Sequence, residues 1–228
     1  MRRHPNQGGS IRTATNPITK PLPPQKAIMK LYFTPGACSL SAHIALKESG
    51  LAHDLVKVDL QAKTLGDGAD FARINPKGQV PALQLDNGEV ITEVTAIIQM
   101  IADRAPEKQL APDNGTVERY RLQEWLNFIG SELHKSFSPL FNPNLPEDAK
   151  AVFRARIDGV FAYIESRLAG HDYLMGSRFT VADSYLFTVM RWADFVKIDL
   201  SALKNLKAYA ERIAARPRVQ AALQAEAA

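Results

Sequence analysis

Residues 30–50, with the sequence KLYFTPGACSLSAHIALKESG, limit the possible folds most, because a strand is followed directly by a helix. The run 30–33 is short and mainly apolar and aromatic, as in a buried strand. Thr34-Pro35-Gly36 interrupts it, and a helical pattern then continues to Gly50. Residues 54–60 form a second apolar, β-rich run. A strand, a helix and another strand predict a parallel strand pair.

Cys38 is the only cysteine of the chain and lies where the predicted helix begins. A thiol at the first turn of a helix faces unpaired backbone N–H groups and the positive end of the helix dipole, which favour the thiolate. A lone cysteine can also be a small buried hydrophobic residue, and composition alone does not separate the two interpretations. The position before a helix favours a nucleophile.

Composition excludes several classes of protein. Among the 228 residues no apolar run approaches the roughly 20 that cross a bilayer, and the N-terminus lacks the apolar core of a secretion signal. We therefore expect a cytoplasmic protein with no membrane partner. A single cysteine forms no internal disulfide, and five scattered histidines without an HxxxH pair predict no metal site.

The net charge of +4 comes from the first 28 residues. They contain five basic residues and no acidic ones, so the rest of the chain carries −1; the five are Arg2, Arg3, Arg12, Lys20 and Lys26. Nucleic-acid binding needs basic residues on the folded part, so we expect no nucleic-acid partner. Residues 1–28 are rich in Pro, Asn, Gly, Ser and Thr, which predicts a disordered extension.

Residues 29–108 read as one α/β domain. After the second strand, residues 61–75 leave room for a short irregular helix. Residues 79–85 and 89–91 predict two strands joined by a turn at Asn87-Gly88. Residues 94–104 then have the spacing of a helix that ends before Pro106. The predicted order is βαβαββα.

Residues 116–228 show only helical patterns, which places a domain boundary within residues 107–115. The first helix, 117–136, has a polar face on which Asn127, Ser131 and His134 recur at i, i+4 and i+7. Such a face alone is typical of a solvated surface. Three later helices are predicted. One begins at Pro146, the next begins at the capping box of Thr180 and has Tyr185 and Trp192 as core residues, and the last follows Ser201 and ends before Pro217.

Five separated blocks resemble the soluble glutathione transferases, in particular the bacterial beta class. The blocks cover the chain from Met29 onward in the right order: KLYFTPGACSLSAHIAL, NPKGQVPALQLDNG, ITE followed by AI, EWLNFIGSELHK and FTVADSYLFTV. The resemblance implies a thioredoxin-like N-terminal domain, matching the predicted βαβαββα order, packed on an all-helical C-terminal domain. It also implies a homodimer with glutathione as co-substrate.

The resemblance assigns glutathione contacts residue by residue. Cys38 lies beside the glutathione sulfur, and Val80, before a cis Pro81, pairs with the cysteinyl unit. Glu93 binds the α-amino group, and the N–H of Val94 binds the carboxylate next to it. Lys63 reaches the glycyl carboxylate, with Gln79 close by. From the helical domain come Asn127, His134 and the segment Ser131, Glu132 and Leu133, with Cys38 and His134 as the catalytic pair.

Two positions depart from the family pattern. Val94 replaces the serine or glycine usual after the acidic residue, so one hydroxyl contact to glutathione is missing. Met175 stands where some relatives have a second cysteine, and Ser41 where a dithiol oxidoreductase would have one. Any thiol–disulfide chemistry of Cys38 must therefore be monothiol.

Two chemistries and one non-catalytic role are compatible with these residues. In conjugation, the glutathione thiolate attacks a small electrophile. In thiol–disulfide chemistry, Cys38 forms a mixed disulfide that a second glutathione resolves. The alternative is a glutathione-binding carrier or interaction protein with the same fold.

Overall fold

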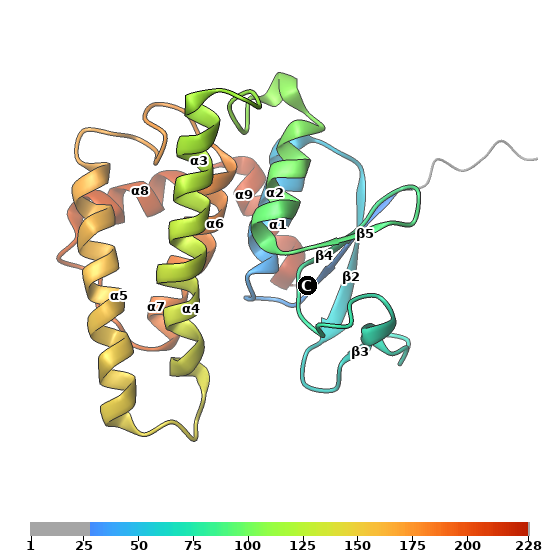
Figure 1. The fold of residues 1–228 in the computed structure, drawn as a ribbon, viewed down its shortest axis with the longest axis horizontal. Helices are drawn as coiled ribbons and strands as arrows, with labels where there is room; N and C mark the ends of the chain where they lie inside the picture. The colour runs from blue at the N-terminus through green and yellow to red at the C-terminus, as the bar shows by residue number, and fades with distance from the viewer. Residues whose placement is uncertain (1–27, 228) are drawn as a thin grey trace, which may run out of the picture.

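The computed structural model describes residues 28–227, and the predicted extension 1–28 lies, apart from Ile28, outside them. The N-terminal domain is built on a five-stranded mixed sheet of order β3-β2-β1-β4-β5 (Figure 1). Its strands are β1 (Met29–Phe33), β2 (His53–Asp59), β3 (Thr64–Leu65), β4 (Ala82–Gln84) and β5 (Val90–Thr92). As predicted, β1 and β2 are parallel, and β4 and β5 form an antiparallel hairpin.

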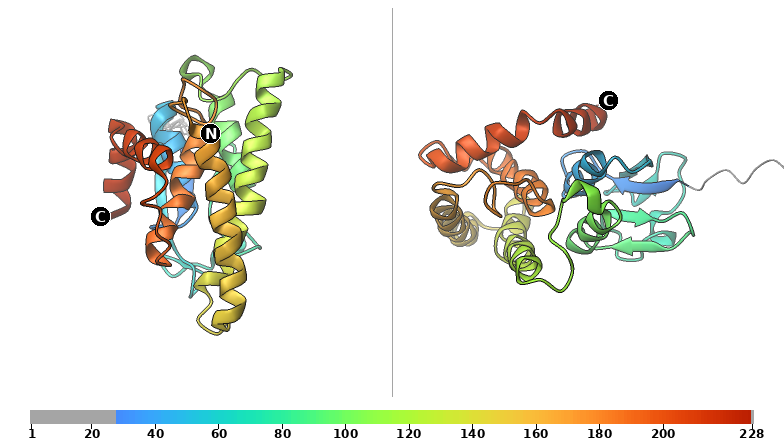
Figure 2. Two further views of the ribbon diagram at one scale, coloured as in Figure 1. Left: turned by 90° about the vertical axis from the view of Figure 1, so that its left-hand side faces the viewer. Right: turned by 90° about the horizontal axis from the view of Figure 1, so that it is seen from above.

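Helices α1 (Ser39–Ser49) and α2 (Val94–Asp103) lie between the sheet and the helical domain (Figure 2). Side chains alternate along β1: Leu31 and Phe33 enter the core shared with these helices, whereas Tyr32 faces the opposite side of the sheet. That side is covered by the 3₁₀ turn η1 (Phe71–Arg73), whose Phe71 is fully buried. The βαβαββα prediction is thus confirmed, with its middle helix reduced to this turn and a short edge strand, β3, added.

The helical domain follows a 3₁₀ turn, η2 (Pro106–Lys108). Its longer helices are α3 (Val117–Phe128), α5 (Glu147–Leu168), α6 (Val181–Met190), α8 (Lys204–Ala214) and α9 (Pro217–Ala227). Between α3 and α5 lie a π-helical turn η3 (Ile129–His134), α4 (Lys135–Phe137) and a 3₁₀ turn η4 (Ser138–Phe141); α7 (Trp192–Phe195) follows α6. No helix within residues 28–227 is both long and apolar enough to cross a bilayer.

The prediction that the last helix ends before Pro217 is wrong in one respect, because a further helix, α9, begins at that proline. A proline at the first helical position loses no intrahelical hydrogen bond, so it starts a helix as readily as it ends one. Helix α9 packs on α1. There His43 Nδ1 lies 3.1 Å from Glu226 Oε1, and both residues are buried.

The two domains share one continuous apolar core, which includes α1 and α2 as well as α3, α5, α6 and α8. Polar contacts also join them. Arg119 of α3 is 3% exposed and makes a two-pronged contact to Asp103 at 2.7 and 2.9 Å. Arg216 makes another to Glu48 of α1, at 2.6 and 3.0 Å. These contacts fix the orientation of the two walls of the cleft described next.

Candidate active site

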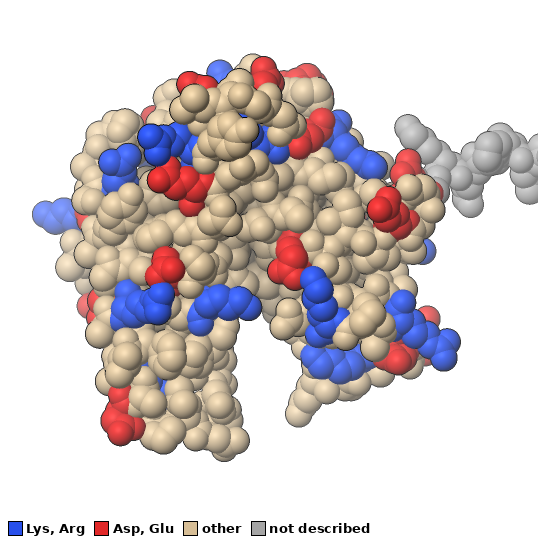
Figure 3. All heavy atoms as spheres, viewed as in Figure 1, with Lys and Arg blue, Asp and Glu red and all other residues tan. Residues whose placement is uncertain are grey.

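A cleft of about 830 Å³ opens between the two domains. Figure 3 shows the notch, with basic side chains on both sides of its mouth. The N-terminal wall comes from the loop after β1, the loop before β4, and the start of α2; the helical wall comes from α3, η3, α6 and α7. Every functional residue inferred from sequence lines this cleft except Glu132 and Leu133.

Cys38 occupies the position before α1 and is half-buried on the cleft wall. Its Sγ–H donates to the carbonyl oxygen of Val80 at 3.2 Å, and the Val80–Pro81 peptide is cis. Burial raises the pKa of the Cys38 thiol to about 12, outweighing the backbone N–H groups of Cys38 and Ser39 and the charge of Lys135. The expectation of a thiolate is therefore wrong for the ligand-free protein: the helix terminus acts in the predicted direction, but desolvation is larger.

Glu93 lies at the start of α2 with a positive φ of 71°. Its carboxylate accepts a 2.6 Å hydrogen bond from Lys77 Nζ, which also donates to Thr92 Oγ1. Val94 is the first residue of α2, so its N–H has no intrahelical acceptor, and its side chain is buried. This corner of the cleft therefore presents a carboxylate beside free N–H donors.

Further polar groups of the N-terminal wall come from the loop before β4 and from Lys63, which lies between β2 and β3. Lys63, with a φ of 59°, donates from Nζ to the carbonyl oxygen of Gly78 at 2.7 Å. Asn75 Nδ2 donates to the carbonyl oxygen of Gln79, also at 2.7 Å. Lys63, Gln79 and Lys77 all line the cleft. Lys77 was missed from sequence, because a lysine beside Pro76 and Gly78 reads only as part of a turn.

The polar face predicted on the first helix is confirmed, since Asn127, Ser131 and His134 all line the cleft. The helix widens here: the N–H of Lys135 donates to the carbonyl oxygen of Gly130, five residues back. Glu132 and Leu133 are corrections to the predicted site. Leu133 is fully buried in the apolar core, and the Glu132 carboxylate pairs with Arg156 of α5 on another side of the helix.

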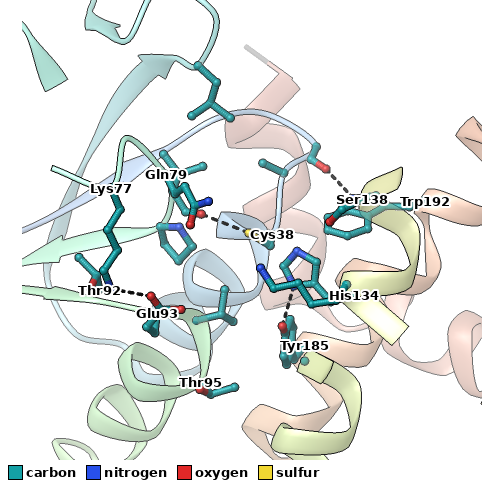
Figure 4. Close-up of a pocket in the computed structure, with 18 of the residues that line it drawn as sticks. Cys38, Lys77, Gln79, Thr92, Glu93, Thr95, His134, Ser138, Tyr185 and Trp192 are labelled. Carbon is teal, nitrogen blue, oxygen red and sulfur yellow. Dashed lines mark hydrogen bonds and ion pairs between the residues drawn. The ribbon is translucent and has the colours of Figure 1, made fainter. Parts of the chain in front are cut away.

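His134 is held by two aromatic residues (Figure 4). Its Nδ1 lies 2.7 Å from the Tyr185 hydroxyl, and its ring lies edge-on to Trp192 with centroids 4.8 Å apart. Burial lowers the pKa of His134 to about 4, so the imidazole is neutral at neutral pH.

Tyr185 and Trp192 were predicted as core residues, and both are buried, yet both also line the cleft. Trp192 Nε1–H donates to the carbonyl oxygen of Gly36 at 2.8 Å, which ties α7 to the loop before Cys38. Helical spacing finds the apolar side of an amphipathic aromatic residue but gives no sign of where its polar atom points.

The charges of the cleft suit a dicarboxylate. Lys63, Lys77 and Lys135 line it with a single acidic residue, Glu93. Glutathione carries two carboxylates and one ammonium group, so this balance matches its charge pattern. Among residues 28–227 no group of three or more His, Cys, Asp or Glu side chains is placed to hold a metal ion.

Comparison with known proteins decides the family. Two family models match the chain: the N-terminal domain of glutathione S-transferases over residues 36–104, and their C-terminal domain over residues 128–217. Glutathione S-transferase GstA of Escherichia coli O157:H7 is 50% identical over 87% of this chain and 98% of its own length. The chain belongs to the glutathione S-transferase family.

Solved structures of glutathione S-transferases share the fold. A beta-class transferase of Sphingomonas chungbukensis superposes with a TM-score of 0.84 at 50% identity, covering 86% of this chain and 98% of its own. A sphingomonad transferase in complex with glutathione also gives 0.84, at 48% identity, covering 87% and 98%. This glutathione S-transferase is therefore similar to bacterial beta-class enzymes, as its sequence blocks predicted.

Proposed function

We propose that the cleft binds glutathione and that its thiolate attacks small electrophiles there, forming a thioether. The arrangement of the two walls supports this most. Cys38, the Val80 carbonyl, Glu93 and the unpaired N–H groups at the start of α2 lie on one wall, and His134 lies on the other. A carrier would need the charged contacts but not a histidine beside the sulfur.

Residues of the cleft can be assigned to each end of glutathione. The Val80 backbone, ahead of Pro81, pairs with the cysteinyl unit. Glu93 takes the γ-glutamyl ammonium, and the Val94 N–H takes the neighbouring carboxylate. Lys63 and Gln79 lie at the glycyl end. Asn127, Ser131 and His134 close the helical wall at the sulfur, and Glu132 and Leu133 drop out of the assignment.

Cys38 acts in conjugation as an S–H donor rather than as a thiolate. The Val80 carbonyl that now accepts its proton is the group assigned to the cysteinyl N–H of glutathione. Binding competes for that carbonyl and frees the Cys38 S–H to donate to the glutathione sulfur. The high pKa of Cys38 keeps the donor protonated at neutral pH.

The second chemistry is monothiol disulfide exchange. The Cys38 thiolate attacks a glutathione mixed disulfide, the other thiolate leaves, and Cys38 becomes bonded to glutathione. A second glutathione thiolate attacks this bond, which releases the Cys38 thiolate and oxidised glutathione. Since burial raises the pKa of Cys38, only a small fraction of the protein carries the reactive thiolate at neutral pH.

We also propose a homodimer in which the N-terminal domain of one subunit faces the helical domain of its partner. This rests on the family resemblance. It leaves the assignments above within one subunit, because all of these residues line the cleft of a single chain.

Glu93→Gln tests the binding mode. The variant keeps the side-chain size and removes the charge that binds the ammonium, so glutathione affinity should fall about tenfold, the value of one exposed charged hydrogen bond. Titration calorimetry measures it, with Glu89→Gln, an exposed residue outside the cleft, as the matched control. Equal affinity of the Glu93→Gln variant and the wild type would contradict the assignment.

A further inference from the structure

The contact between His134 and Tyr185 determines which imidazole nitrogen carries the proton. Tyr185 projects from α6, is 3% exposed, and places its hydroxyl 2.7 Å from Nδ1 of His134 in η3. In Figure 4, His134 lies between Tyr185 and Cys38. The hydroxyl can donate to Nδ1 or accept from it, and the two arrangements give the histidine opposite roles.

The hydroxyl has one acceptor available. Within residues 28–227, Nδ1 of His134 is the one protein acceptor within hydrogen-bond distance of the Tyr185 oxygen. A buried O–H that donates to nothing carries a desolvation penalty, so the hydroxyl donates and Nδ1 accepts. A neutral imidazole has one proton, and with Nδ1 accepting, that proton is on Nε2.

The surroundings agree with a neutral ring. Burial lowers the pKa of His134, Lys135 lowers it further, and Glu93 acts weakly in the opposite direction. Cys38 faces the same cleft as a protonated thiol. Trp192 restrains the ring from its side and commits its own N–H to Gly36, so it does not compete for Nδ1.

We propose that Tyr185 is a positioning residue, which fixes His134 in the tautomer whose Nε2–H points into the cleft and donates to the glutathione sulfur. The inference rests on the proposed function for the identity of that sulfur. It makes His134 a hydrogen-bond donor to the thiolate and excludes it as the base that removes the thiol proton. The base in the bound complex is then solvent or the ligand itself.

Tyr185→Phe removes the hydroxyl and keeps the ring. With Nδ1 released, the histidine samples both tautomers, so about half of the molecules keep the Nε2–H donor and the rate of conjugation at saturating glutathione should fall about twofold. The KM for glutathione should change less, because the charged ends are untouched. The pKa of bound glutathione read from the pH–rate profile should rise. The matched control is Tyr32→Phe, whose buried hydroxyl donates to Gln84 outside the cleft and whose loss should leave the rate unchanged.

The wild-type protein gives a test that needs neither a variant nor activity. Nitrogen-15 spectra of the histidine rings distinguish protonated from unprotonated nitrogens. At pH 7, His134 should show a protonated Nε2 and an unprotonated Nδ1, with Tyr185→Phe shifting both towards a mixture. A protonated Nδ1, or an imidazolium, in the wild type overturns the inference even if the enzyme conjugates glutathione.

Two substitutions of His134 distinguish a role as hydrogen-bond donor from a role as general base. The amide of His134→Gln carries an N–H near the place of Nε2 but cannot take a proton at neutral pH, so it should keep most of the rate. His134→Ala should lose roughly tenfold. Equal loss in both variants would make His134 a base and overturn the proposal. Absence of conjugation in the wild type would instead count against the proposed function, and the spectra would still decide the tautomer.

Discussion

Cys38 and His134 meet at the cleft as two neutral groups. Burial raises the pKa of the thiol to about 12 and lowers that of the imidazole to about 4. Neither is therefore charged in the ligand-free protein at neutral pH, and the positive charge near the reacting sulfur comes from Lys135. Stabilisation of a glutathione thiolate must come from hydrogen-bond donors and from lysine charge.

The pH dependence of Cys38 labelling follows from its raised pKa. The thiolate fraction of a thiol rises about tenfold per pH unit until its pKa is reached. Alkylation of the ligand-free protein by iodoacetamide should therefore increase steadily from pH 7 to pH 9.5 with no plateau. Because Cys38 is the only cysteine, mass spectrometry reports it alone. Free glutathione, measured in parallel, should level off above its ordinary thiol pKa; a plateau of Cys38 near neutral pH would show an activated thiolate instead.

Cys38→Ala separates the two chemistries. Disulfide exchange needs the protein sulfur, so reduction of a glutathione mixed disulfide should disappear. Conjugation needs only a donor from Cys38, so it should fall about tenfold or less. Both rates are measured on the same preparation, and loss of the two activities to the same degree would argue against this division of roles.

His134 makes the protein sensitive to acid. Its pKa is lowered in the fold, so the stability it contributes is present above about 6.5 and is lost as pH falls towards 4, by up to about 3 kcal/mol. Asp183 acts in the opposite direction, since burial raises its pKa to about 6. The difference in unfolding free energy between wild type and His134→Gln isolates the histidine. That difference should shift in favour of the variant between pH 6.5 and pH 4, and a constant difference would contradict the lowered pKa.

At the scale of elements, the junction between α8 and α9 holds the C-terminal helix against α1, the helix that follows Cys38. Arg216 pairs with Glu48 of α1, and the Glu48 side chain is only 8% exposed. The guanidinium of Arg216 also lies 4.2 Å from the centre of the Phe179 ring. Arg216→Ala leaves that carboxylate buried without its partner and should lower the unfolding free energy by about 3 kcal/mol. Chemical denaturation measures the loss.

The control for Arg216 is an exposed pair. Arg121 and Glu124 lie 2.8 Å apart on α3 with both side chains about two-thirds exposed, so Arg121→Ala should cost under about 0.5 kcal/mol. A similar loss in both variants would mean that burial adds nothing to the Arg216 contact and that α9 is held by its other contacts with α1.

Elements with a local signal were predictable from sequence, whereas features set by tertiary contacts were not. The Asn87-Gly88 turn and the capping box of Thr180 and Asp183 lie where their local chemistry placed them. The two-residue strand β3 exists only through its pairing with β2, and the π-helical turn at Ile129–His134 has no residue signature. The sequence around Pro217 is compatible both with the end of one helix and with the start of another. The direction of the Cys38 pKa shift depended on burial, which spacing alone does not give.

At the scale of the whole molecule, the cleft lies between an α/β domain and an all-helical domain, which one continuous apolar core holds together. The start of α2, where the proposal places a carboxylate of glutathione, lies on one wall, and His134 of η3 lies on the other. The proposed dimer adds a second such interface between subunits. Light scattering at micromolar concentration should give twice the chain mass, and a monomer would contradict the proposed assembly.

The most direct test of the whole account is the steady-state formation of thioether from glutathione and an aryl halide, 1-chloro-2,4-dinitrobenzene, by the wild-type protein. We expect a saturable rate in glutathione, well above the uncatalysed reaction, because the cleft supplies donors and lysine charge to the thiolate. A protein that binds glutathione in calorimetry but leaves this rate, and those with epoxides and haloalkanes, at the uncatalysed level would be a carrier, contrary to the account.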